Sequence, residues 1–312
     1  MKAQNYEIQK DAFAHTFSIV ARDTATGEMA VGVQSHWFSV GSVVAWGRSG
    51  VGVVATQSFV NPAYGPRGLD LMAAGYTASE ALDSLVALDD GKDYRQVAFL
   101  DTEGRTAAHT GEKCVEAASH INDTNFSVQA NMMLNDAVVP AMEKAFKDHA
   151  DLPLAERVVK VLQAAQEAGG DIRGKQSAAL LVVGPTKVEN SWEDKKIDLR
   201  VDDHAEPLEE LDRLLKVARA YEHMNRGDLA MEEEDVEEAL EQYGLAMEMF
   251  PDNLEMKYWT AVALANSDRL EEAIPLFEGI FAEDENWREM TRRLPASGLL
   301  NVSEKELEEI VN

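Results

Sequence analysis

Short apolar runs separated by turn residues dominate the first two thirds of the chain, and this pattern predicts β-strands. The runs are rich in Val, Ala and Thr and cover residues 17–22, 28–35, 51–58, 95–101, 105–110 and 177–184. The segment Thr24-Ala25-Thr26-Gly27 separates the first two runs and predicts a hairpin turn. Strands joined by hairpins favour an antiparallel sheet.

Apolar residues recur at helical spacing in four further segments. These segments are residues 68–76, 79–90, 136–148 and 153–168. Thr77 or Ser79 is a suitable N-cap for the second helix. The helices come in pairs between the strands. This order favours an α+β fold, in which helices cover antiparallel sheets, over an alternating parallel fold.

The last third of the chain is predicted to be helical and contains an internal repeat. The segment that begins at Ala239 aligns with the segment that begins at Ala273, and Tyr243 aligns with Phe277 at the same offset of 34 residues. This offset is the period of tetratricopeptide units, which usually need about three repeats to be stable. We therefore expect the two repeats to pack on a helix at residues 206–225. They form either a helical appendage or a groove for a protein partner.

The charge of the chain is strongly acidic, with a formal net charge of −27 over 312 residues. Residues 205–312 contain 10 Lys and Arg against 28 Asp and Glu, a net charge of −18. This shift in composition places a domain boundary between residues 204 and 205. Such a charge repels nucleic-acid phosphates and anionic lipids, so we expect no nucleic acid partner and no membrane partner.

A single cysteine, Cys114, excludes an intramolecular disulfide and fits a reducing compartment. Residues 1–15, which we call the leader, are polar and lack the apolar core of a secretory signal. We therefore expect a cytoplasmic protein with a leader at 1–15, a first domain at 16–204 and a helical domain at 205–312.

Motifs for metals and nucleotides are missing from the sequence. The seven histidines show neither HExxH nor HxH spacing, and the glycine-rich strings lack the GK[ST] ending of a phosphate-binding loop. The acidic run at 232–235 is the pattern of a solvated helix start, because adjacent helical residues do not share a face. We expect no metal and no organic cofactor.

Several polar residues lie in or beside the apolar strands, where an unpaired hydroxyl or amide would cost a few kcal/mol. They are Ser35, Thr56, Gln57, Asn131, Asp171 and Arg173. Either they bond one another across loops or they form a functional site. The pattern alone leaves both interpretations open.

Six strings along the first domain resemble one family. They are TFSIVARD (16–23), VGVQSHWFSVGSVVAW (31–46), GVGVVATQSFVNPAYGPRGLDLM (50–72), RQVAFLD (95–101), HTGEKC (109–114) and GGDIRGKQSAALLVV (169–183). Over residues 16–204 the chain is similar to the domain-of-unknown-function family 1028, whose fold is like that of the N-terminal-nucleophile hydrolases. The resemblance implies a four-layer αββα sandwich whose first strand starts at the nucleophile.

The resemblance assigns the nucleophile position to Thr16. A threonine hydroxyl needs a base, and a free α-amino group with a pKa near 8 can take its proton. Thr16 has a free amine only after the leader is removed. The bond between His15 and Thr16 is cut by the chain itself or by a protease, or the site is inactive. Ser18, on the same strand face, is the alternative hydroxyl.

Further roles follow from the resemblance. Ser35 is a partner for the amine or hydroxyl of Thr16, and Asn131 is an oxyanion donor. Thr56 and Gln57 orient the substrate. Asp171 and Arg173 either hold a polar substrate or fix a turn. Cys114 is expected to be buried packing rather than a nucleophile.

Three functional hypotheses remain. The first is an amidohydrolase that acts on a small amide-containing substrate through Thr16. The second is a non-catalytic module that binds a small molecule and recruits a protein through the helical repeats. The third, compatible with both, is that the acidic helical tail serves solubility or homo-oligomer formation.

Overall fold

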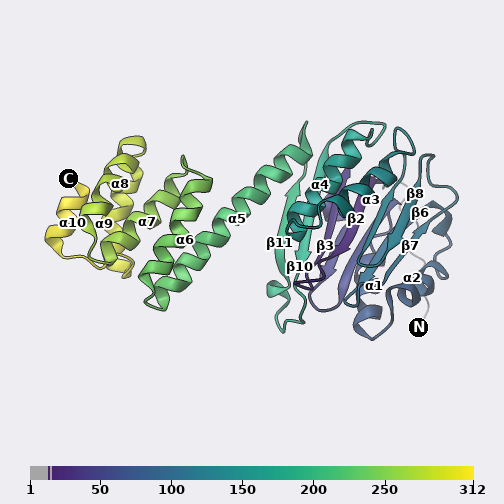
Figure 1. The fold of residues 1–312 in the computed structure, drawn as a ribbon, viewed down its shortest axis with the longest axis horizontal. Coiled ribbons are helices and arrows are strands. Elements are labelled where there is room, and N and C mark those ends of the chain that lie inside the picture. Colours follow the sequence, from purple (N-terminus) through teal and green to yellow (C-terminus); the bar gives the residue numbers. More distant parts are fainter. Residues whose placement is uncertain (1–12, 15) are drawn as a thin grey trace. The chain divides into compact units, whose positions relative to one another are not determined.

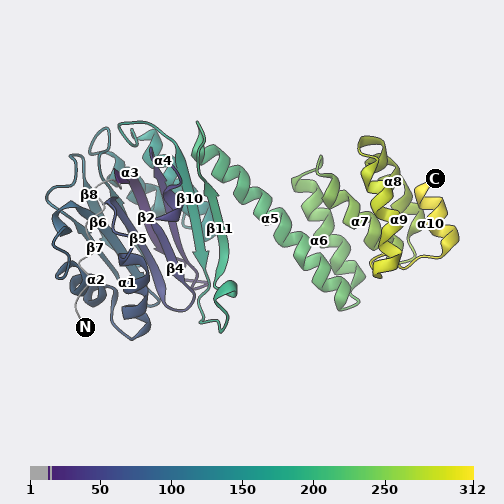
Figure 2. The ribbon, with the colours of Figure 1, turned by 180° about the vertical axis from the view of Figure 1, so that it is seen from behind.

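The computed structural model describes residues 13–14 and 16–312, and it divides into two units after Leu215 (Figures 1 and 2). The first unit contains two antiparallel β-sheets and four helices, followed by the first turns of a fifth helix. The strands are β1 Phe13–Ala14, β2 Thr16–Arg22, β3 Met29–Ser35, β4 Ala45–Arg48, β5 Gly52–Phe59, β6 Arg95–Asp101, β7 Thr106–Thr110, β8 Ser119–Asp123, β9 Phe126–Ala130, β10 Ser177–Val183 and β11 Lys195–Val201. The helices are α1 Tyr64–Ala73, α2 Ala78–Val86, α3 Val138–Asp148, α4 Leu154–Glu167 and α5 Pro207–Glu232.

The two sheets have different strand orders. The first sheet runs β1-β5-β6-β7, with β4 also paired to β5. The second sheet runs β11-β10-β3-β2-β9-β8, which puts β2 near its centre. The neighbouring strands in both sheets run antiparallel within the described residues, as the hairpin pattern predicts.

Each sheet has one face against the other sheet and one face against a pair of helices. Val20 of β2, Val31 of β3 and Val53 of β5 belong to the core between the sheets. Helices α1 and α2 cover the first sheet, and α3 and α4 cover the second. The predicted four-layer αββα sandwich is therefore confirmed.

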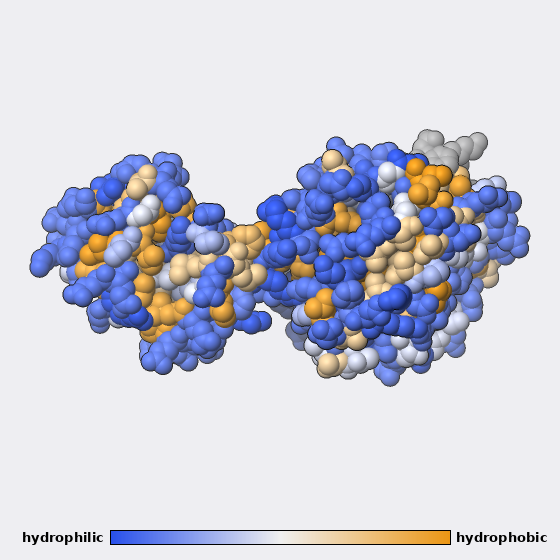
Figure 3. Space-filling model, turned by 45° about the horizontal axis from the view of Figure 1, so that its top comes forward, coloured by the Kyte–Doolittle hydropathy of each residue, from blue (hydrophilic) through white to orange (hydrophobic). Residues whose placement is uncertain are grey.

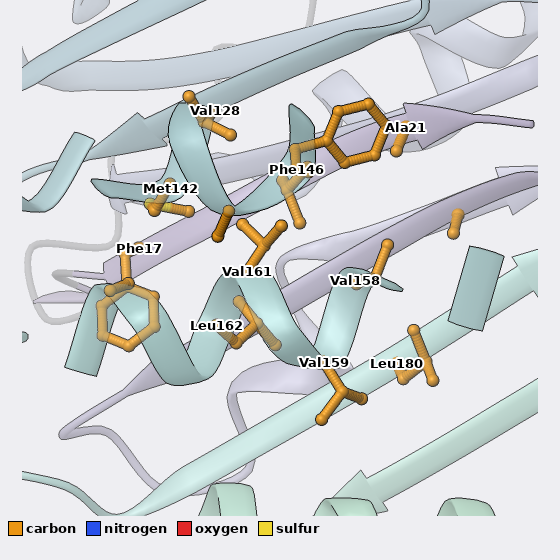
Figure 4. Packing of buried hydrophobic residues seen from close by; sticks show 14 of the residues in the cluster. Phe17, Ala21, Val128, Met142, Phe146, Val158, Val159, Val161, Leu162 and Leu180 are labelled. Carbon is orange, nitrogen blue, oxygen red and sulfur yellow. The ribbon is translucent and has the colours of Figure 1, made fainter. Parts of the chain in front are cut away.

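The core under α3 and α4 shows how the alternation along β2 builds these layers (Figure 4). Phe17, Ile19 and Ala21 face the helices, and all three side chains are fully buried. Met142 of α3 and Leu162 of α4 pack in the same cluster. Thr16, Ser18 and Val20 consequently face the other sheet, because successive side chains of a strand point to opposite faces.

Local signals set the ends of several elements. Thr77 caps α2 in a capping box with Glu80, which decides between the two predicted caps. The predicted turn at 24–27 joins β2 to β3, and Gly27 adopts a φ of 74° there. Such a positive φ is costly for residues with a Cβ.

The second unit is helical, as the sequence predicts. It contains the rest of α5 and the helices α6 Val236–Met249, α7 Leu254–Asn266, α8 Leu270–Glu283, α9 Asn286–Ser297 and α10 Glu304–Val311. The bounds of α6 and α8 differ by the predicted period of 34 at both ends. The predicted repeat is thus one helix pair followed by the next.

The division between the units lies inside α5, whereas the shift in charge places it before this helix. Leu208, Leu211 and Leu215 of α5 belong to the core under α3 and α4. Ala220 and Met224 of α5 belong to a core with α6 and α7. A change in charge composition reflects the surface residues of a segment. It does not show which hydrophobic core the apolar residues of that segment join.

The face in Figure 3 is mostly hydrophilic, with smaller apolar patches between the charged residues. Within residues 13–14 and 16–312, no helix has both the length and the apolar character to cross a bilayer.

Candidate functional site

Thr16 begins β2 near the centre of the second sheet and is completely buried. Its register partner in β3 is Ser35, and the register partner of Ser35 in β10 is Ser177. All three residues are 0% exposed. The start of β2 therefore carries a row of three hydroxyl residues across neighbouring strands, which includes the predicted pair Thr16 and Ser35.

The carbonyl oxygen of Thr16 accepts three hydrogen bonds. The backbone N–H of Asn131 donates at 3.1 Å and its side-chain Nδ2 at 3.4 Å. The third donor is Nε2 of Gln57, at 3.2 Å, which reaches across from the other sheet. Three donors on one carbonyl fix the position of Thr16 from both sheets.

Gln96, at the start of β6, is the centre of the polar network between the sheets. Its Oε1 accepts hydrogen bonds from Nε2 of Gln57 at 2.7 Å and from Nδ2 of Asn131 at 2.9 Å. Its Nε2 donates to the carbonyl of Ala130 and to Oγ1 of Thr110, both at 2.9 Å. The two residues that hold Thr16 are thus themselves held by Gln96.

Ser18 lies on the same face of β2 as Thr16, as predicted, and is also fully buried. Its hydroxyl donates to Oε1 of Gln57 at 2.6 Å and accepts from Nε2 of Gln129 at 2.6 Å. These bonds connect Ser18 to both sheets. The arrangement fits a structural role for Ser18 better than a role as nucleophile.

Thr56 and Gln57 lie on opposite faces of β5. Gln57 faces the second sheet, whereas the hydroxyl of Thr56 donates to the carbonyl of Asn61 at 3.2 Å. Val54, on the same face as Thr56, packs in the core with α1 and α2. The structure therefore brings Gln57 to Thr16 and turns Thr56 away from it.

Asp171 and Arg173 form a partly buried ion pair beside the end of β3. Nη2 of Arg173 lies 2.7 Å from Oδ2 of Asp171, whose side chain is fully buried. The same carboxylate oxygen accepts the backbone N–H of His36 at 3.1 Å. The pair thus holds the backbone directly after Ser35, and its predicted roles, holding a polar substrate or fixing a turn, stay predictions.

An open surface cavity of about 550 Å³ lies next to the network. It is lined by Thr110, Gly111, Glu112, Cys114, Glu116, Ala117, Ala118, Ser119, His120 and Asp136. Nδ1 of His120 is 2.8 Å from the hydroxyl of Thr110, which is bonded to Gln96. The cavity is therefore linked to Thr16 by a chain of side-chain hydrogen bonds.

Two titratable groups in this cavity have shifted pKa values. Burial lowers the pKa of His120, and the nearby His109 lowers it further. Burial raises the pKa of the Cys114 thiol, so the nucleophilic thiolate is disfavoured. Cys114 is half-buried rather than buried, and its Sγ donates to the carbonyl of Arg95 at 3.4 Å, so its packing role stays a prediction.

The sequence analysis did not select Gln96, Gln129 and His120. Gln96 and Gln129 carry the signal used for Gln57, a polar side chain within a strand. Within the described ranges, no group of three or more His, Cys, Asp or Glu residues has the geometry to hold a metal ion.

Comparisons with known proteins place both units. Residues 16–211 match a family model described as a family of unknown function, DUF1028, and residues 230–292 match a tetratricopeptide repeat model. The chain is similar to protein SPO2555 from Silicibacter pomeroyi, whose crystal structure carries the same family description. The two are 29% identical with a TM-score of 0.59, over 66% of this chain and 89% of that one. No curated protein matches the chain. With more than half of its length matched, the chain belongs to the DUF1028 family.

Proposed function

We propose that the first unit is an amidohydrolase of the N-terminal-nucleophile type, in which Thr16 is the nucleophile once the leader is removed. The observation that carries the proposal is the position of Thr16. It is a buried hydroxyl residue at the start of a central strand, and three donors hold its carbonyl. A fixed carbonyl leaves the amine and hydroxyl of the same residue in a defined geometry, which nucleophilic catalysis needs.

The reaction consumes one water molecule and needs no cofactor. Oγ of Thr16 bonds to the carbonyl carbon of the substrate while its proton passes to the α-amino group of Thr16. The C–N bond then breaks, and the amine leaves with that proton. Water hydrolyses the resulting ester, which releases the carboxylic acid and restores the hydroxyl.

The neighbouring residues take positioning roles in this proposal. Asn131 donates to the carbonyl of Thr16 through both its backbone and its side chain, so its geometry supports holding the nucleophile. The predicted oxyanion role of Asn131 stays a prediction. Ser35 is the register partner of Thr16, which supports the predicted bond to its amine or hydroxyl.

The test compares three single variants in a chain that starts at Thr16. Thr16→Ala should abolish hydrolysis of any amide found by screening, and Thr16→Ser should keep part of it, because serine retains the hydroxyl. Thr124→Ala, at an exposed position in the β8–β9 turn, is the matched control and should keep full activity. Hydrolysis by Thr16→Ala at the original rate would reject Thr16 as the nucleophile.

We also propose that the second unit binds a protein partner. The match of residues 230–292 to a tetratricopeptide repeat supports it, because stacked helix pairs of this kind present extended binding surfaces. Affinity capture tests this proposal with two baits, the complete chain and a chain that ends at Leu215 and so lacks the second unit. Identical captured proteins would reject the proposal.

A further inference from the structure

The strand β1 ends two residues before Thr16 and pairs with the other sheet. Phe13 pairs with Phe59 and Ala14 pairs with Ser58, so these two leader residues belong to the first sheet. Thr16 pairs with Ser35 and belongs to the second sheet. A single residue separates the two ladders. The backbone edge of β5 at Ser58 and Phe59 is therefore the surface next to the bond that must be cut.

The strand β4 does not cover this part of the β5 edge. β4 pairs with β5 only from Gly52 to Ala55, and the next bond on that side runs from the N–H of Thr56 to the carbonyl of Val44 at 3.1 Å. Ser58 and Phe59 follow, and β1 pairs with them. If β1 left, the edge would expose unpaired backbone groups, which bind extended segments by strand addition.

The edge is held rigid by side chains that do not belong to β1. Nη1 of Arg95 donates to the carbonyl of Phe59 at 2.6 Å, and its Nε is 2.9 Å from Oδ2 of Asp89. The side chains of Arg95 and Asp89 are only 6% and 12% exposed. Gln57, the residue before Ser58, is bonded to the carbonyl of Thr16. The edge and the nucleophile thus keep their relative position without the leader.

Ser58 has a second feature that points to a ligand. It is fully buried. Its φ is 70°, a value that residues with a Cβ rarely adopt. A strained backbone at a buried residue is costly, and such strain concentrates at ligand-binding positions.

We propose that the β5 edge at Ser58 and Phe59 binds the acyl side of an extended, peptide-like substrate, and that β1 occupies this edge in the uncleaved chain. The inference rests on the proposed function. A substrate that replaces β1 runs in the same direction and presents at least two backbone amides before its scissile carbonyl. Simple amides without such a segment would bind weakly, because they cannot form the ladder.

The test is a binding measurement on the complete chain and needs no catalysis. The double variant F13P/A14P cannot form the β1 ladder, because proline lacks the N–H and restricts the residue before it. The probe is the acetylated and amidated peptide of residues 6–14, YEIQKDAFA. The wild-type chain and the variant are compared after intact mass has shown that both keep the leader. Thermal unfolding of both shows that the variant is folded.

The variant should bind the peptide about tenfold more tightly than wild type does. The same peptide with N-methyl groups on its last Phe and Ala keeps its side chains but loses two donors, and it should bind about tenfold more weakly. Equal affinity of wild type and variant, or of both peptides, would overturn the inference. Adding Thr16→Ala separates it from the proposed function, because this change should leave peptide binding intact even where it abolishes hydrolysis.

Discussion

The candidate site is built from amide and hydroxyl side chains, and only its surroundings are titratable. Gln57, Gln96 and Asn131 hold the carbonyl of Thr16 directly or through one another. None of these amide side chains titrates over the physiological range. His120, two hydrogen bonds from Gln96, is the titratable residue at the end of this chain.

Protonation of His120 should destabilise the first unit. Burial lowers its pKa from the usual 6.5, so the unfolded chain takes up the proton more readily than the folded one. The contribution of uncharged His120 to the free energy of unfolding is fully present above pH 6.5, and it is lost as the pH falls through the pKa of the folded state. Urea unfolding at about pH 7.5 and about pH 5 measures the loss. The loss should be smaller in His120→Gln, and an equal loss in both chains would contradict this prediction.

The sequence predicts the residues of the site better than their arrangement. Thr16, Ser35, Gln57 and Asn131 do meet, because strand alternation puts polar residues of neighbouring strands on one face. Thr56 does not, because the same alternation turns it toward α1. The bonds that join Gln57 to Thr16 and Asn131 to Gln96 cross between the sheets, and no pattern within one strand encodes which residues of two sheets face each other.

At the scale of elements, two glycines allow α1 to approach the first sheet closely. A Cβ on Gly65 would lie 2.2 Å from the ring of Trp46, and a Cβ on Gly68 would lie 2.4 Å from the ring of Phe99. Both distances are too short for real atoms, so a side chain at either position would push the helix away from β4 and β6. Here glycine is required by space and not by backbone conformation.

Replacing Gly68 by Ala should lower the free energy of unfolding by about 2 kcal/mol, the usual effect of overpacking a core. The matched control is Gly244→Ala in α6, where a Cβ would meet no atom within 4 Å. This change should raise the stability by about 1 kcal/mol through helix propensity alone. Chemical unfolding of both variants measures the difference, and a gain in stability for Gly68→Ala would show that α1 is not tightly packed.

The elements that the sequence missed are those with broken apolar patterns. Ser127 and Gln129 interrupt β9 because they belong to the polar network, although the whole strand is buried. β8 carries mostly polar residues with little burial, and β4 is short and half-buried. The helix pairs were predicted well, since their apolar faces lie on sheets and so keep the helical period.

At the scale of the whole molecule, the first unit extends into α5. Leu208, Leu211 and Leu215 are at most 6% exposed and belong to its core. A chain that ends at Leu215 should therefore unfold at nearly the same urea concentration as the first unit of the complete chain. A chain that ends at Ala205 should be less stable by about 5 kcal/mol, because burial of three leucines is lost. Equal midpoints for the two truncated chains would show that these leucines contribute no stability.

The most direct measurement is the intact mass of the protein purified from the cells that produce it, together with the sequence of its N-terminus. The proposed mechanism requires a free amine on Thr16, because in this proposal the amine is the base that activates the hydroxyl. We predict a chain that begins at Thr16 and whose mass is lower by the mass of residues 1–15. A chain that hydrolyses amides while it still carries these residues would contradict the assignment of Thr16 as an N-terminal nucleophile.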